Sequence, residues 1–600
     1  MAVTKTNFIN YARCKRYVAL DELKKDKLSK CISYEEYKKE EESSELNELL
    51  SEMYEDDITD EDNSELLVML PYYKEIELLA GKKVFELFGG KTIYALDTKC
   101  QKSFTFDENG CKYLCYVDIY NENDEINIIE VKATTSKKYL ELNVKDEIFY
   151  KDDMGIYHLK DEESFDQKKI KEYNSKINKL LDKYDPCGKY IYDIAVQRMI
   201  IEGNLKCDKF TSKKINYYLA TLNHEYIFDG TYENAKPKYT NDIICLFDVT
   251  KITEYLQDKV LNDKLEINKY ISLMDKSACN LGEYCEYKRK SKCKFTKICM
   301  KHIPKYNSSL SYMNNGFGFK DECGNIHKGL DLINEGYINM LDVPLSWIKN
   351  KNHIIEREAL ITHKPYIDKE KIKLALNNIK YPIYHLDFET FPCPLPRFKG
   401  EKCYTQSPFQ FSLHIERYPG VCDKEKDHYE FLSTDMDKDE RYVLVKKLCE
   451  YIKPDGTLFA QNVSFERSRL KELANTFKEY KSTLLKICDT AYDLLYVVKG
   501  NSKFYESMGY DKKSAKVVNF YDERLSGSYS IKKTLPVFSD LKYDDMDVKN
   551  GTEALVTYAR FKHMDSATFK SMYNALLEYC KQDTWAMVVI LDKIRKIVNE

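Results

Sequence analysis

The chain lacks several features that would assign it to familiar classes of protein. It has no apolar run near the roughly 18 residues that a membrane span needs, and its start, MAVTKTNFIN, lacks the apolar core of a signal peptide. With 94 Lys and Arg against 98 Asp and Glu, it lacks the positive excess of a histone-like protein. It shows no internal repeat of solenoid length. We therefore expect a cytoplasmic protein with no membrane partner, in which local basic grooves remain compatible with nucleic acid.

Length and composition predict a folded chain with more than one domain. The chain has 600 residues, of which 43% are hydrophobic and 13% aromatic, so it can build packed interiors. It has 19 cysteines, for which a reducing cytoplasm favours free thiols or metal ligands over disulfides. The acidic stretch from Glu35 to Glu65 is expected to be a solvated loop or helix without a catalytic role.

Strand and helix signals divide the chain into three regions. Strand-like and helical segments alternate in residues 1–304 and again in residues 381–600. Residues 305–380 begin with Asn, Ser and Gly and then become lysine-rich and helical in pattern. We expect two unrelated α/β domains joined by a helical linker.

The first region contains a possible metal site on a predicted β-hairpin. The segments KYLCYVDIY and INIIEVKATTS flank the polar turn NENDE. Alternation puts Glu130 and Lys132 on one face of the second strand, within reach of Asp118 on the first. Two carboxylates can hold Mg²⁺ or Mn²⁺, and the ammonium can position water or stabilise charge on a phosphate. An exposed strand face with a salt bridge is the alternative.

The flanking helical segments strengthen the metal-site interpretation. Glu86 lies upstream in GKKVFELF, and Asp193 and Gln197 lie one helical turn apart in YIYDIAVQRMII. This order of residues resembles RecB-like nucleases of the PD-(D/E)XK class, which have a restriction-endonuclease-like mixed sheet flanked by helices and cleave DNA with divalent metals. The resemblance implies metal ligands at Glu86, Asp118 and Glu130, a catalytic lysine at Lys132, and the motif glutamine at Gln197. Ile201 departs from the family, which often has a tyrosine there for a substrate contact.

Cysteines supply an independent signal. Cys279, Cys285, Cys293 and Cys299 lie within SACNLGEYCEYKRKSKCKFTKIC, and Cys14 lies near the start of the chain. Such thiolates can converge on zinc or an iron–sulfur cluster. One cysteine before the core and three after it resembles AddB-type nucleases and CRISPR-associated RecB-like exonucleases, which bind a [4Fe–4S] cluster. The resemblance implies Cys14, Cys285, Cys293 and Cys299 as its ligands, and a local zinc site that uses Cys279 is the alternative.

The last region contains a second acidic pattern. In the strand YPIYHLDFETF, Asp387 and Glu389 point to the same face, about 7 Å apart, and can share two metal ions that lie ~4 Å apart. Near the C-terminus, Asp583 interrupts an apolar helical stripe, where an unpaired carboxylate is costly. A metal is an economical partner for it. Tyr579 precedes it by one turn on the same side.

Together with Glu466 in FAQNVSFE, this series resembles DEDD 3′–5′ exonucleases of the DnaQ-like class. Their tyrosine subclass includes RNase D and DNA polymerase proofreading domains, and their fold is an RNase H-like mixed sheet with helices. The resemblance implies metal ligands at Asp387, Glu389, Glu466 and Asp583, with Tyr579 orienting the attacking water. Glu466 stands where the family usually has Asp.

Most of the chain further resembles a bacterial family filed as a domain of unknown function, number twenty-seven seventy-nine, which joins the same two modules. We therefore expect a metal-dependent nuclease that acts on DNA, single-stranded or at ends, in repair, recombination or defence. Its expected cofactors are Mg²⁺ or Mn²⁺ at two sites and a [4Fe–4S] cluster. The alternatives are an RNA 3′–5′ exonuclease that uses only the C-terminal site and a catalytically degenerate scaffold that binds nucleic acid.

Overall fold

The computed structural model divides the chain into two compact units. It describes residues 1–28, 68–94, 100–142, 147–208, 213–287, 291–543 and 545–599. The acidic stretch from Glu35 to Glu65 lies outside the described residues. Unit 1 comprises Met1–Cys299 and Cys393–Thr405, and unit 2 comprises Met300–Pro392 and Gln406–Glu600.

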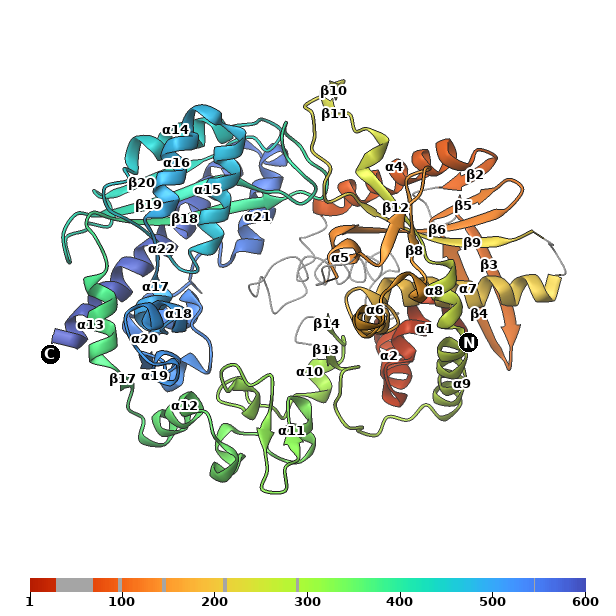
Figure 1. Ribbon diagram of the computed structural model, residues 1–600, viewed down its shortest axis with the longest axis horizontal. Helices are drawn as coiled ribbons and strands as arrows, with labels where there is room; N and C mark the ends of the chain where they lie inside the picture. Colours follow the sequence, from red (N-terminus) through yellow and green to blue (C-terminus); the bar gives the residue numbers. More distant parts are fainter. Residues whose placement is uncertain are drawn as a thin grey trace. The chain divides into compact units, whose positions relative to one another are not determined.

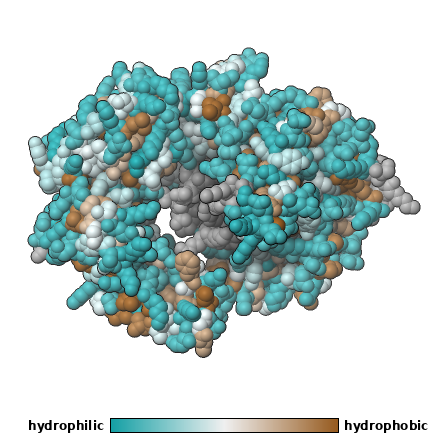
Figure 2. All heavy atoms as spheres, in the orientation of Figure 1, coloured by the Kyte–Doolittle hydropathy of each residue, from teal (hydrophilic) through white to brown (hydrophobic). Residues whose placement is uncertain are grey.

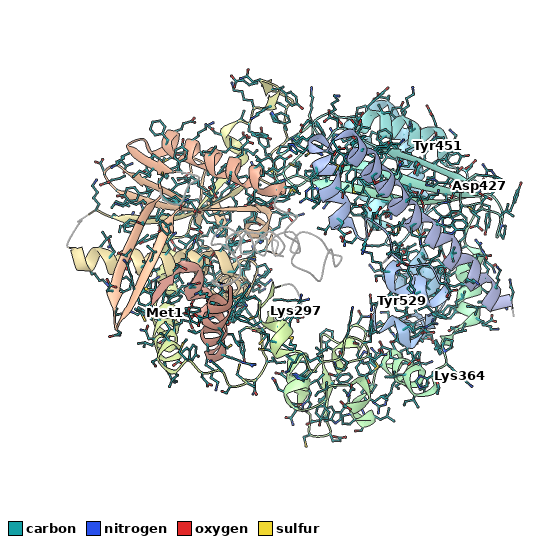
Figure 3. All side chains as sticks on the ribbon, turned by 180° about the vertical axis from the view of Figure 1, so that it is seen from behind. Met1, Lys297, Lys364, Asp427, Tyr451 and Tyr529 are labelled. Carbon is teal, nitrogen blue, oxygen red and sulfur yellow. The ribbon has the colours of Figure 1, made fainter. Side chains whose placement is uncertain are left out.

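Unit 1 contains a seven-stranded and a three-stranded sheet (Figure 1). The large sheet comprises, in spatial order, β2 (Lys91–Tyr94), β5 (Ile119–Glu122), β6 (Ile126–Thr135), β9 (Ile215–Leu222), β12 (Ile244–Asp248), β8 (Ile156–Leu159) and β7 (Phe149–Lys151). The small sheet comprises β1 (Ala2–Thr4), β4 (Cys111–Val117) and β3 (Lys102–Glu108). The strand β1 follows Met1, labelled in Figure 3, and runs parallel to β4. In the large sheet β6 is parallel to β9 and antiparallel to β5, so the sheet is mixed.

Helices cover these sheets. The helices of unit 1 are α1 (Lys5–Tyr11), α2 (Lys15–Leu28), α4 (Leu70–Phe88), α5 (Lys137–Leu140), α6 (Gln167–Leu180), α7 (Gly188–Asp208), α8 (Thr250–Tyr255), α9 (Gln257–Leu273) and α10 (Thr296–Cys299). The helix α4 packs against β2, β5 and β6, and α7 packs against β3, β4 and β9. Ile76, Ala80 and Val84 of α4 are buried and recur every four residues, which defines its inner face.

The predicted hairpin around NENDE is formed by β5 and β6, with Ile119 opposite Ile129. The preceding strand β4 belongs to the small sheet, so the chain passes from one sheet to the other at Asp118. Continuing the same antiparallel register by one residue sets Asp118 opposite Glu130. Side chains so paired are close neighbours.

Unit 2 is built around a five-stranded mixed sheet. Its strands, in spatial order, are β20 (His428–Leu432), β19 (Gln406–Glu416), β18 (Ile383–Pro392), β21 (Thr457–Ala460) and β22 (Ala491–Asp493). The strand β19 is antiparallel to both β18 and β20, whereas β18, β21 and β22 run parallel. The helices around the sheet include α14 (Arg441–Tyr451), α15 (Ser464–Thr476), α16 (Lys481–Asp489) and α22 (Ser566–Asn599).

Alternation along β18 separates a core face from a polar face. Tyr384, Leu386 and Phe388 join the hydrophobic core beneath α14, α15 and α16. Asp387 and Glu389 point to the other face of the sheet. The helix α22 packs on β18 and β19, and Figure 1 shows it on the opposite side of the sheet from α14–α16.

Smaller elements complete unit 2. They are α11 (Leu330–Asn334), α12 (Lys351–Thr362), α13 (Lys369–Asn377), α17 (Leu494–Val498), α18 (Ser502–Ser507), α19 (Lys512–Ala515), α20 (Ile531–Phe538), α21 (Gly551–Arg560), β15 (Phe319–Lys320), β16 (Ile326–His327), β17 (Tyr366–Ile367) and β23 (Phe520–Tyr521). Residues 305–380, expected as a linker, carry α11, α12 and α13 and have a small core that includes Tyr312, Met340 and Trp347. This region therefore belongs to a folded unit rather than forming an extended connection.

The predicted mixed α/β architecture with two units is confirmed. Hydrophobic side chains are scattered in small groups over the mostly hydrophilic face seen in Figure 2. Among the described residues, every helix is too short or too polar to cross a membrane.

Candidate metal centres

The first acidic cluster lies where β5 and β6 meet. Oδ2 of Asp118 accepts a hydrogen bond of 2.8 Å from the backbone amide of Val131. Glu130 on the same hairpin is 1% exposed. Burial, followed by the negative charge of Glu130, raises the pKa of Asp118 to about 6. The predicted pair of carboxylates is therefore close enough for the charge of Glu130 to act on Asp118.

The positive charges of two lysines balance the negative charge of Glu130. Nζ of Lys132 lies 2.9 Å from Oε1 of Glu130 and 3.3 Å from Oδ2 of Asp193. Lys5, the first residue of α1, forms a second ion pair with Glu130. Burial alone would raise the pKa of Glu130, but Lys132 and Lys5 outweigh burial and lower it. Lys5 was missed from the sequence because only the tertiary fold brings the start of the chain to β6.

The helix α7 contributes the predicted glutamine. Nε2 of Gln197 donates to Oε2 of Glu130 at 3.0 Å and to the carbonyl of Tyr116 at 3.1 Å. Asp193, one turn earlier, is held beside Lys132, and burial raises its pKa. Ile201 is fully buried in the core of unit 1.

Glu86, the glutamate predicted as a ligand from the helix before the hairpin, is exposed and accepts a hydrogen bond from Asn241. Glu77 of the same helix lies closer to the cluster, since burial and the charges of Asp118 and Glu130 raise the pKa of Glu77 to about 8. Nine residues, or two and a half turns, separate the two glutamates and put them on opposite sides of α4. The apolar stripe of α4, which begins at Ile76 next to Glu77, was the sequence feature that could have pointed to Glu77.

The segment Cys393–Thr405 contacts the elements that carry the first acidic cluster, although it lies far from them in the sequence. The Tyr404 hydroxyl donates to the carbonyl of Ala133, the residue after Lys132. Tyr404 also contacts Tyr73, one turn before Glu77 on α4. This tyrosine thereby links the strand of Lys132 to the helix of Glu77.

The five cysteines singled out in the sequence line one small cavity in unit 1. They are Cys14, Cys279, Cys285, Cys293 and Cys299. Cys14 precedes α2, and Cys299 ends α10, the helix that carries Lys297 in Figure 3. Nη1 of Arg16 lies 3.4 Å from Sγ of Cys299. Burial raises the pKa of Cys279 and of Cys285 to about 11, so both thiols are protonated at neutral pH unless a metal binds them.

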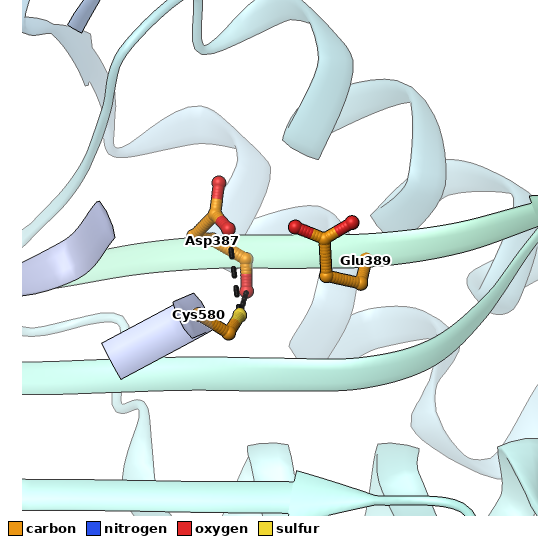
Figure 4. Close-up of side chains that lie close together, drawn as sticks. All are labelled: Asp387, Glu389 and Cys580. Atoms are coloured by element: carbon orange, nitrogen blue, oxygen red, sulfur yellow. Dashed lines mark hydrogen bonds between the residues drawn. The ribbon is translucent and has the colours of Figure 1, made fainter. Parts of the chain in front are cut away.

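The second acidic cluster lies on the polar face of β18. Asp387, Glu389 and Cys580 each offer a donor atom within 4.8 Å of the other two (Figure 4). In the part of the chain that the structure describes, this is the one group of three such residues that meets that distance. Burial and the charge of Asp583 raise the pKa of Asp387 well above the usual range. Burial and the charges of Asp387 and Asp583 do the same for Glu389.

The helix α22 brings Asp583 and Tyr579 to the same place. Asp583 is 8% exposed and accepts a hydrogen bond of 2.6 Å from the hydroxyl of Tyr543. Burial raises the pKa of Asp583 to about 6, although the hydroxyls of Tyr543 and Tyr579 and the charge of Lys532 oppose the rise. The predicted apolar stripe is confirmed, since Leu576, Ala586 and Ile590 are buried with these residues.

Glu466 reaches the cluster from α15. It is 3% exposed, and burial and the charge of Asp387 raise its pKa well above the usual range. Its Oε2 atom has no hydrogen-bond partner among the described residues. The loop before α15 is held by Asp493, which accepts hydrogen bonds from the amides of Asn462 and Val463. All four predicted acids of unit 2 are thus brought together.

Two residues of this cluster were not predicted from the sequence. Tyr543 lies in a loop, and Lys532 lies in the segment GSYSIKK, where its positive charge partly opposes the rise in the pKa of Glu389. The same segment contains Tyr529, labelled in Figure 3, whose carbonyl accepts a hydrogen bond of 2.6 Å from Gln461. The segments FAQNVSFE and GSYSIKK, quoted for their resemblance, therefore contact each other.

Comparison with known proteins adds one finding. No curated protein and no solved structure matches the chain. Residues 384–530, which run from β18 to the segment GSYSIKK, match the family described as "Domain of unknown function (DUF2779)". This match supports, for that part of unit 2, the family that the sequence indicated.

Proposed function

We propose that the protein is a metal-dependent nuclease that hydrolyses phosphodiester bonds of DNA. The observation that carries the proposal is the convergence of Asp387, Glu389, Glu466 and Asp583 from β18, α15 and α22. Buried carboxylates that raise one another's pKa have a large unmet need for positive charge. Divalent cations meet that need, and two such ions can stabilise the attacking and leaving oxygens of a phosphodiester.

The topology of unit 2 supports an RNase H-like, DnaQ-like exonuclease. Three antiparallel strands are followed by two strands parallel to the first, and the acids lie on the first strand and on the helices around it. Tyr579 is 4% exposed beside Asp583 and has the place of the residue that orients the attacking water in the tyrosine subclass. Mg²⁺ or Mn²⁺ are the expected ions.

Unit 1 supports a second nuclease site of the PD-(D/E)XK class. Asp118, Glu130 and Glu77 are the proposed metal ligands, with Lys132 as the catalytic lysine. The five-cysteine cavity fits a [4Fe–4S] cluster held by Cys14, Cys285, Cys293 and Cys299, which would join the two ends of the first segment of unit 1.

A single zinc ion is the alternative for this cavity, because both zinc and an iron–sulfur cluster take thiolate ligands. The zinc site would use Cys279, whose thiol lies beside that of Cys14.

A single-site RNA 3′–5′ exonuclease is the second candidate. It is favoured by the ion pairs of Glu130 with both Lys5 and Lys132, which leave the first cluster better balanced in charge than the second. A scaffold in which both sites are degenerate would bind nucleic acid without cutting it. In all three candidate functions, the DNA nuclease, the RNA exonuclease and the scaffold, the acidic face of β18 would contact a nucleic acid strand.

The test is cleavage of labelled single-stranded DNA, double-stranded DNA and single-stranded RNA with Mg²⁺ or Mn²⁺. Asp387→Ala should abolish the activity of the second site and Lys132→Ala that of the first. Asp437→Ala, at a 61% exposed aspartate of unit 2, is the matched control and should leave both unchanged. Absence of cleavage with either metal on all three substrates would refute the proposal, and cleavage of RNA alone would favour the second candidate.

A further inference from the structure

A buried thiol lies inside the acidic cluster of unit 2. Cys580 follows Tyr579 on α22 and is fully buried. Its Sγ lies 3.4 Å from Oδ2 of Asp387 and 4.0 Å from the backbone carbonyl of the same residue. Figure 4 shows the sulfur directed at Asp387, with Glu389 on the same side of the strand. Core cysteines usually face apolar neighbours, so this position among carboxylates is unusual.

The three donor atoms fit one cation. Sγ of Cys580 and one oxygen each from Asp387 and Glu389 lie within 4.8 Å of one another. Glu466 adds a carboxylate oxygen that is buried and has no hydrogen-bond partner among the described residues, on a side chain that feels the charge of Asp387. A thiolate with carboxylates suits a soft or borderline divalent ion, whereas Mg²⁺ prefers oxygen alone.

We propose that Cys580 is a sulfur ligand that gives this site a second binding mode, for thiophilic divalent cations such as Zn²⁺ or Cd²⁺. The inference rests on the proposed function only in taking the acids to be cation ligands. With Mg²⁺ the thiol keeps its proton and its hydrogen bond to Asp387. With a thiophilic ion the S–H bond breaks, the proton leaves to solvent and a metal–sulfur bond forms, with no change of oxidation state. Oδ2 of Asp387 is then released to bind the same ion.

This second mode determines metal specificity. A thiophilic ion held by sulfur and two carboxylates occupies the ligands that Mg²⁺ needs, so the site should exchange it slowly. Zn²⁺ would therefore inhibit the proposed nuclease rather than support it.

The experiment is a Cd²⁺ titration of the full chain, followed by the near-ultraviolet absorption that thiolate-to-cadmium bonds produce. Cys580→Ser should lose the contribution of one thiolate and bind Cd²⁺ at this site at least about 100-fold more weakly, because even second-shell changes cost roughly 10- to 100-fold. Cys488→Ser is the matched control, since Cys488 is buried in the apolar core of unit 2 and its thiol donates to the backbone carbonyl of Arg467 rather than to a carboxylate. It should match the wild type, and the five-cysteine cavity contributes equally in every variant.

Asp387→Asn provides an independent check because it retains Cys580 and removes a proposed partner. It should lose the same one-thiolate contribution to the absorption as Cys580→Ser. If Cys580 bound Cd²⁺ without Asp387, this contribution would remain. Wild-type absorption in a folded Cys580→Ser variant, or in Asp387→Asn, overturns the inference even if the protein cleaves DNA with Mg²⁺. Loss of the one-thiolate contribution in both variants supports the inference even if no nuclease activity is found. The sulfur ligand and the nuclease function can therefore be refuted separately.

Discussion

Replacing Asp583 by Asn should stabilise unit 2 in the absence of metal. It should also remove the stabilisation that metal binding gives unit 2. Asn keeps an oxygen that accepts the 2.6 Å hydrogen bond from Tyr543 but carries no charge. Burial raises the pKa of Asp583 to about 6 from 3.8, and this difference corresponds to roughly 3 kcal/mol at 1.36 kcal/mol per pH unit. The folded chain holds this proton more tightly than the unfolded chain, so ionisation at neutral pH costs stability.

The sign of the effect fixes its pH dependence. Below about pH 4 the carboxyl is protonated in both states, and the variant should gain nothing. Between about pH 4 and pH 6 the unfolded chain releases this proton and the folded chain retains it, so the wild type loses stability relative to the variant. Above about pH 6 the loss is complete, at about 3 kcal/mol. In a domain of this size that is roughly 6 °C in the Tm of unit 2.

The assay is thermal unfolding with a chelator at pH 4 and pH 8, repeated with Mn²⁺. Mn²⁺ should raise the Tm of unit 2 in the wild type at pH 8 and leave the Tm of unit 2 in Asp583→Asn almost unchanged, while the response of unit 1 stays the same in both. Glu416→Gln is the control of opposite sign: Glu416 is fully buried but paired with Arg595 and His385, which lower its pKa, so its loss should destabilise at pH 8. A variant less stable than the wild type at pH 8 without metal, or equally stabilised at pH 4, would contradict the reasoning.

Three further predictions concern unit 1. Glu77→Gln should weaken Mn²⁺ binding at the first cluster, measured by calorimetry, whereas Glu86→Gln should not, because only Glu77 feels the other carboxylates. Tyr404→Phe removes the donor to the carbonyl of Ala133 and should lower the free energy of unfolding by about 1–3 kcal/mol, measured by denaturant titration; no change would show that the contact is dispensable. Cys279→Ser should keep the visible absorption of an iron–sulfur cluster after anaerobic purification and Cys285→Ser should lose it, and the reverse result would reassign the ligands.

Local pattern predicted some of the candidate site well. Period-two alternation put Asp387 and Glu389 on one face of a strand because side-chain direction in a strand is set by the backbone itself. The apolar stripe of α22 likewise placed Asp583 and Tyr579 toward the core. The pattern around Glu86 was less informative, because the buried side of α4, with Ile76, Ala80 and Val84, lies away from Glu86.

The strands, the long helices and the acids that share a face within one element could be predicted from local pattern, since these follow from backbone periodicity and apolar burial. Which elements meet became clear in the folded chain. Folding brought Lys5 to Glu130, Tyr543 to Asp583 and Cys580 to Asp387, contacts between side chains that no local pattern relates. It also put Cys393–Thr405, which lies between two strands of unit 2, into unit 1. Such contacts depend on how the whole chain packs, because burial rewards any apolar or hydrogen-bonded match regardless of its distance along the sequence.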